Sequence, residues 1–162
     1  MTEDFLKDTK TLERIMSGVL EVSLESLPHD VPIAASIYHI EKGEHQLLSC
    51  KHNSREILND PTNHAEINVI REASQKIGDW RLEDCVLFAT LEPCIMCAGA
   101  IVQSRMGAVV FGAYDTQYGA CGSIYNFLSD PRLNHNPLVV SGILERECSD
   151  ILNKFFDELR KK

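Results

Sequence analysis

The chain has 162 residues, enough for one domain with a sizeable core, and its 44% hydrophobic and 25% charged residues are typical of a folded globular protein. Its net charge of −8 argues against a broadly basic nucleic-acid surface, although it leaves room for a local basic patch. The acidic start shows no targeting signal, and no stretch approaches the length of a membrane span. We therefore expect a single domain over residues 1–162, located in the cytoplasm and not in a membrane.

The first third of the chain predicts a helix followed by a β-hairpin. Apolar residues at helical spacing predict an amphipathic helix over residues 3–26. Apolar and β-branched residues predict strands over residues 33–40 and 46–50, joined by a Lys-Gly turn. His39 and His45, near the tip of this hairpin, are expected to face solvent.

The middle of the chain predicts alternating helices and strands. Residues 51–60 are polar without a clear period and are expected to form a loop. A helix is expected from about residue 62 to residue 77, followed by a strand over residues 85–91 whose continuous apolar character indicates burial on both faces. Pro93 is expected to open the next helix.

The last third continues this alternation. We expect a strand over residues 108–111, a glycine-rich turn over 119–122, a short helical piece over 124–128, and a strand over 138–140. An apolar stripe after Gly142 predicts a final helix that packs on the sheet. The order of elements predicts an α/β fold of three layers, α/β/α, with a mixed central sheet of about five strands flanked by helices.

Two short stretches carry the candidate chemistry: His64-Ala65-Glu66 and the sequence PCIMC at residues 93–97. The order of elements brings the start of each helix to the carboxyl end of the strand between them, where open α/β sheets bind ligands. Cys94 and Cys97 are three residues apart on a helix, so both sulfurs can reach one metal. With His64 they offer three ligands of the types that zinc prefers and leave a fourth position for water. Glu66 is then placed to carry protons.

The same residues allow other interpretations. Cys-x-x-Cys alone is compatible with a redox dithiol, and a structural zinc site could recruit Cys121 as a fourth ligand. His64 alone would more often be a helix-capping residue. The cysteines outside the pair are expected to be small buried apolar residues, namely Cys50, Cys85, Cys121 and Cys148.

Longer motifs resemble the bacterial-type tRNA-specific adenosine deaminases, a family within the cytidine and deoxycytidylate deaminase superfamily. These motifs are DPTNHAE at 60–66, TLEPCIMCAGA at 90–100, FGAYD at 111–115 and GACGS at 119–123. The resemblance covers residues 31–156. It implies a cytidine deaminase-like fold, a homodimer with one Zn2+ per subunit, and conversion of the wobble adenosine of a tRNA anticodon stem-loop to inosine.

The resemblance also implies roles for individual residues. His64, Cys94 and Cys97 match the zinc ligands, and Glu66 matches the proton shuttle. Asn53 resembles the residue that hydrogen-bonds the target purine. Asp115 falls where the family contacts the sugar-phosphate path beside the flipped nucleoside, although an ordinary turn residue is expected there equally on sequence alone.

Some features depart from the family pattern and keep rival functions open. Asn63 and Ala34 stand where Ala and Gly are expected, the hairpin is longer, and the final helix carries Asp157 and Glu158 where relatives tend to be basic. A deaminase of a free base or nucleotide, such as guanine or deoxycytidylate, is one alternative. The other is an inactive subunit that keeps zinc for folding and contributes to tRNA binding or dimerisation.

Overall fold

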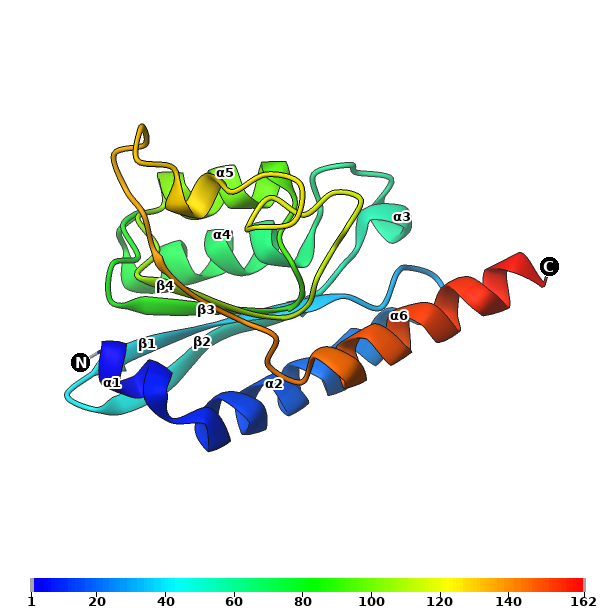
Figure 1. The fold of residues 1–162 in the computed structure, drawn as a ribbon, viewed down its shortest axis with the longest axis horizontal. Coiled ribbons are helices and arrows are strands. Elements are labelled where there is room, and N and C mark those ends of the chain that lie inside the picture. The colour runs from blue at the N-terminus through cyan, green and yellow to red at the C-terminus, as the bar shows by residue number, and fades with distance from the viewer. Residues whose placement is uncertain (1, 162) are drawn as a thin grey trace.

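The computed structural model describes residues 2–161 and is built on a five-stranded sheet (Figure 1). The strands lie in the order β2-β1-β3-β4-β5. β1 pairs antiparallel with β2 and β3, whereas β3, β4 and β5 are parallel to one another. Their bounds are β1 Ala34–Glu41, β2 Glu44–His52, β3 Cys85–Leu91, β4 Ala108–Ala113 and β5 Leu138–Ser141. The predicted mixed sheet of five strands is confirmed.

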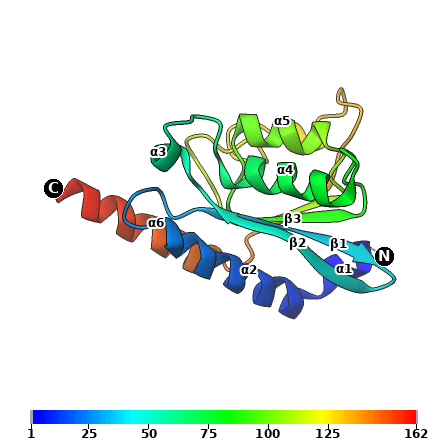
Figure 2. The same cartoon turned by 180° about the vertical axis from the view of Figure 1, so that it is seen from behind.

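Helices cover both faces of this sheet, which confirms the three-layer prediction (Figure 1, Figure 2). α4 and α5 lie on one face, and α2 and α6 lie on the other. The helices are α1 Thr2–Lys7, α2 Thr9–Ser23, α3 Arg55–Leu58, α4 Ala65–Ile77, α5 Ile95–Gln103 and α6 Glu145–Arg160, with 3-10 turns η1 Leu24–Ser26 and η2 Phe127–Ser129. Among the described residues, no helix is both long and apolar enough to cross a bilayer.

The central strand β3 separates two apolar cores. Leu87 and Ala89 belong to the core beneath α4 and α5, while Val86 and Phe88 belong to the core beneath α2 and α6. Successive side chains of a strand point to opposite faces, so a strand covered on both sides must be apolar throughout. The apolar run over residues 85–89 of β3 is therefore explained by its position.

The prediction of one continuous N-terminal helix over residues 3–26 is wrong. It is divided at Asp8, whose carboxylate accepts hydrogen bonds from the backbone N–H and the hydroxyl of Thr11 (3.2 and 2.7 Å) and so caps the start of α2. An aspartate side chain competes with the helical hydrogen bonds of the backbone and favours a new helix start. The residues that follow α2 tighten into the turn η1.

Other expectations also need correction. The segment expected to be a loop, 51–60, begins with the end of β2 and contains α3. The short helical piece expected at 124–128 lies at Phe127–Ser129.

His39 and His45 are half-buried and do not simply face solvent. The centre of the His45 ring lies 5.5 Å from the ring centre of Phe5 and 5.8 Å from that of Tyr38. An imidazole can bury its apolar body while its nitrogens stay wet. Of the four isolated cysteines, Cys50 is only half-buried and the others are buried as expected.

Candidate active site

The starts of α4 and α5 meet beside the carboxyl end of β3. Each helix begins one residue after a candidate ligand, because His64 and Cys94 occupy the two N-cap positions with extended backbone angles. Both helices therefore start a few residues later than the sequence predicted. Small buried residues of the first turns, Ala65 and Ala98, pack into the core below and fix the helix ends against the sheet.

Three ligand atoms converge at this junction. His64 Nδ1 lies 3.6 Å from the Sγ of Cys94 and 3.5 Å from the Sγ of Cys97, and all three atoms lie within 4.8 Å of one another. Zinc–sulfur and zinc–nitrogen bonds of about 2.3 and 2.1 Å at a tetrahedral angle place the two ligand atoms about 3.6 Å apart. The two observed distances from His64 to the sulfurs therefore fit tetrahedral zinc.

This cluster holds three candidate ligands and not four. Within residues 2–161, the group that could hold a metal contains His64, Cys94 and Cys97. Cys121 is not part of it; its buried thiol instead faces the carbonyl oxygen of Pro93 at 3.7 Å. The alternative of a structural site closed by Cys121 is therefore not supported.

The two thiols of the cluster have opposite proton affinities. A hydrogen bond from Cys97 lowers the pKa of Cys94 to about 4, against the opposing effect of burial, and His64 assists. The same hydrogen bond, together with burial and the neighbouring carboxyl of Glu66, raises the pKa of Cys97. The contact with Cys94 also raises the pKa of His64. One thiolate is thus present near neutral pH, and a metal that binds here displaces the remaining protons.

Glu66 lies in the first turn of α4 with only 4% of its surface exposed. Burial raises the pKa of this carboxyl, and the nearby imidazole of His64 lowers it in part. A carboxyl group whose pKa is raised toward neutrality can both take up and release a proton during a reaction. A buried carboxyl group beside a three-ligand metal site can transfer protons next to a Lewis acid.

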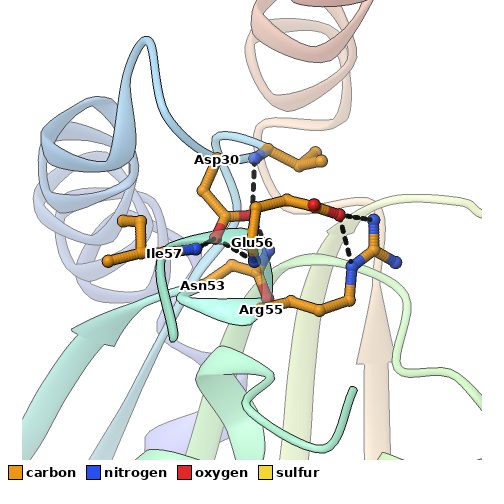
Figure 3. Close-up of polar contacts among 6 residues, drawn as sticks. Asp30, Asn53, Arg55, Glu56 and Ile57 are labelled. Carbon is orange, nitrogen blue, oxygen red and sulfur yellow. Dashed lines mark hydrogen bonds and ion pairs between the residues drawn. The ribbon is translucent and has the colours of Figure 1, made fainter. Parts of the chain in front are cut away.

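Asn53 is buried and directly follows the end of β2. The backbone N–H of its neighbour Ser54 donates to the carbonyl of Asn63 at 3.1 Å, so this segment lies against the residue that precedes His64. The side-chain Nδ2 of Asn53 donates to Oδ1 of Asp30 at 2.6 Å (Figure 3). The position agrees with a site at the edge of the candidate active site, while the role of Asn53 toward a purine stays a prediction.

Asp115 lies in the loop that follows β4, and its side chain acts within that loop. One of its carboxylate oxygens accepts the backbone N–H groups of Gln117 and Tyr118 at 2.9 and 3.0 Å. This is the arrangement of a turn residue, the simpler of the two sequence interpretations. A contact of Asp115 with substrate stays a prediction.

Sequence reasoning did not assign a role to Glu92, which holds this same loop in place. Its carboxylate is 2% exposed and accepts the backbone N–H of Asp115, Cys121 and Ser123 at 3.0 Å each, and the hydroxyl of Ser123 at 2.5 Å. A Cβ on Gly119 would collide with this carboxylate, which explains the glycine. The signal in the sequence is a charged residue that directly follows a buried and mostly apolar strand.

Comparison with known proteins defines the class. A family model described as MafB19-like deaminase matches residues 10–160, nearly the whole chain. A guanine deaminase structure from Nitrosomonas europaea, 23% identical, aligns with a TM-score of 0.74 over 88% of this chain and 83% of its own, which shows the shared fold. The chain is thus a deaminase with the fold expected from the sequence.

Nearer relatives define the family. The tRNA-specific adenosine deaminase of Bacillus subtilis is 49% identical over 82% of this chain and 80% of its own length, and that of Aquifex aeolicus is 44% identical over 81% and 83%. A structure from a study of A-to-I editing by tRNA:A34 deaminases at the wobble position is 38% identical, with a TM-score of 0.77 over 85% of this chain and 97% of its own. The chain belongs to the tRNA-specific adenosine deaminase family, and the resemblance drawn from its motifs is confirmed.

Proposed function

We propose that this protein hydrolyses the wobble adenosine of a tRNA anticodon to inosine, with one Zn2+ held by His64, Cys94 and Cys97. The observation that carries the proposal is the spacing of these three ligand atoms at distances suited to tetrahedral zinc, in a chain that is 49% identical to a tRNA-specific adenosine deaminase. Glu66 is the proposed proton shuttle, Asn53 the purine-binding residue and Asp115 a contact to the nucleotide backbone.

The chemistry divides between the metal and the chain. Zinc, when bound, lowers the pKa of a water molecule to about 7. Glu66 takes one proton of the water and delivers it to the ring nitrogen, and then carries the second proton from the new hydroxyl on C6 to the amino group. The bond from C6 to oxygen forms, the bond from C6 to nitrogen breaks, and ammonia leaves. Asn53 holds the purine while this happens, and the buried position of Glu66 keeps bulk water from competing for its proton.

The assembly proposed around this site is a homodimer with one zinc per subunit, each subunit a single domain over residues 1–162. The exposed Gly99 of α5, between Ala98 and Ala100, offers a place where a second surface can approach closely. A tRNA substrate agrees with a cytoplasmic location.

The test compares substrates that differ in one feature. The zinc-loaded protein is incubated with an anticodon stem-loop bearing adenosine at the wobble position, with the same stem-loop bearing cytidine there, and with free adenosine, cytidine and guanine. We expect ammonia release and inosine, read by sequencing, from the wobble-adenosine stem-loop. Cys97→Ser is the control and should lose both zinc and turnover. Release of ammonia from guanine or cytidine in place of the stem-loop would refute the proposal.

A free-base deaminase is the second candidate because the chain carries 24 acidic against 16 basic residues. That imbalance weakens attraction to phosphates. A guanine deaminase structure from Bacillus subtilis is also 26% identical, with a TM-score of 0.58 over 93% of this chain and 94% of its own. The free-guanine sample in the same experiment decides between the two.

A further inference from the structure

Asp30 is a buried carboxylate outside the zinc cluster that collects hydrogen bonds from three segments of the chain. It lies before β1 and is 1% exposed. Its Oδ1 accepts Nδ2 of Asn53 at 2.6 Å and the backbone N–H of Val31 at 2.9 Å. Its Oδ2 accepts the backbone N–H groups of Glu56 and Ile57 at 2.8 and 3.2 Å (Figure 3).

These contacts fix the orientation of the Asn53 amide. Both oxygens of the Asp30 carboxyl accept from N–H donors, so the Asn53 amide turns its nitrogen toward Asp30. One N–H of Asn53 is used in this way, and its other N–H and its carbonyl oxygen remain to meet a ligand. Among residues 2–161, no donor is bonded to the side-chain Oδ1 of Asn53, whereas its backbone oxygen contacts Nδ1 of His52 at 2.8 Å.

We propose that Asp30 is a positioning residue, which orients the side-chain amide of Asn53 so that its carbonyl oxygen and second N–H face the target purine. The inference rests on the proposed function for the identity of that purine, and on the contacts in Figure 3 for the orientation. Asp30 acts only through Asn53 and touches no reacting atom.

Asp30→Asn tests this orientation with almost no change of shape. The oxygen of the new amide satisfies the two fixed backbone N–H groups of Glu56 and Ile57, so its NH2 group faces Asn53 and also leaves the backbone N–H of Val31 without its acceptor. Asn53 must then rotate its carbonyl oxygen toward residue 30. The substitution inverts the Asn53 amide and removes the acceptor offered to the purine.

A double-mutant cycle separates positioning from general structural support. We expect Asp30→Asn to lower kcat/KM on the wobble-adenosine stem-loop at least tenfold, mainly through a higher KM. In an Asn53→Ala background, Asp30→Asn should lower kcat/KM less than twofold, because the amide through which Asp30 acts has been removed. Asp79→Asn, which alters a carboxylate bonded to Arg81 after the end of α4 opposite to His64, is the matched control and should leave kcat/KM unchanged. An equal loss in both backgrounds would overturn the proposal.

A second measurement does not depend on turnover. In the NMR spectrum of the wild-type protein, one side-chain N–H of Asn53 should be shifted downfield and protected from exchange by Asp30, while the other exchanges freely. Two equivalent, freely exchanging protons would reject the orientation. If wild-type protein forms no inosine but this signal is present and is lost in Asp30→Asn, the positioning role stands and the proposed function fails.

Discussion

Two glutamates on α4 have opposite environments, and the contrast shows how burial decides the use of a side chain. Glu72 faces Ser49, Lys51 and Lys76, which lower its pKa to about 2 and hold it as a carboxylate on the surface. Glu66, two turns earlier, is buried beside the thiol cluster, and burial raises its pKa. The same side chain is a surface ion-pair partner in one position and a candidate proton carrier in the other.

Glu66→Gln keeps the shape of this side chain and removes its ability to carry a proton. Because Glu66 is not among the three clustered ligand atoms, we expect full zinc content with kcat on the stem-loop reduced by about 10²–10⁴. Metal analysis and single-turnover kinetics on one preparation measure both quantities. Near-normal turnover, or loss of zinc with the activity, would exclude Glu66 as the proton shuttle.

At the scale of elements, the loop between β4 and β5 is attached to the residues before α5, mainly through the buried side chain of Glu92. Glu92 accepts four hydrogen bonds from this loop, and the backbone N–H of Ala120 adds a fifth contact to Pro93 at 2.9 Å. The loop therefore lies over the stretch that carries Cys94. Its position depends on a carboxylate that can accept from several donors at once.

Glu92→Gln replaces one accepting oxygen with an NH2 group that faces the N–H of Asp115. A buried donor without a partner destabilises the fold, so we expect the free energy of unfolding to fall by about 2–4 kcal/mol, measured by urea denaturation. We also expect kcat/KM to fall at least tenfold as the loop shifts away from α5. Glu72→Gln, the same change on an exposed salt bridge, should alter stability by less than about 1 kcal/mol. Equal effects of the two variants would contradict the role of Glu92 in holding the loop between β4 and β5.

At the scale of the whole molecule, the sequence predicted what depends on periodicity and local motifs. The apolar run of β3 and the amphipathic helices indicated three layers, and the spacing of Cys94 and Cys97 with His64 indicated the cluster. Asp30 could not be found this way, because it lies 23 residues from Asn53 and belongs to no motif. Asp8 was missed for a different reason: its capping bond to Thr11 outweighed a helical pattern that continues through it.

The candidate metal ligands His64, Cys94 and Cys97 lie at the ends of helices that are packed in an extensive apolar core, and this leads to a prediction for the whole protein. Val69 and Ile101 anchor α4 and α5 in the same buried cluster as the sheet residues beneath them. We therefore expect metal-free protein to stay folded by far-UV circular dichroism but to lose all deamination. A metal at about 1,000 times its dissociation constant contributes about 4 kcal/mol, so the melting temperature should fall by about 10 °C.

Re-addition of metal completes this prediction. Zn2+ should restore both activity and melting temperature, whereas Mg2+ should restore neither, because two thiolates and an imidazole are poor ligands for a hard cation. In Cys97→Ser, which lacks one ligand, the chelator should leave the melting temperature unchanged. Activity that survives verified metal removal would contradict a metal-dependent reaction. Loss of secondary structure on metal removal would instead mean that the cluster holds the fold together, and that the two cores do not suffice.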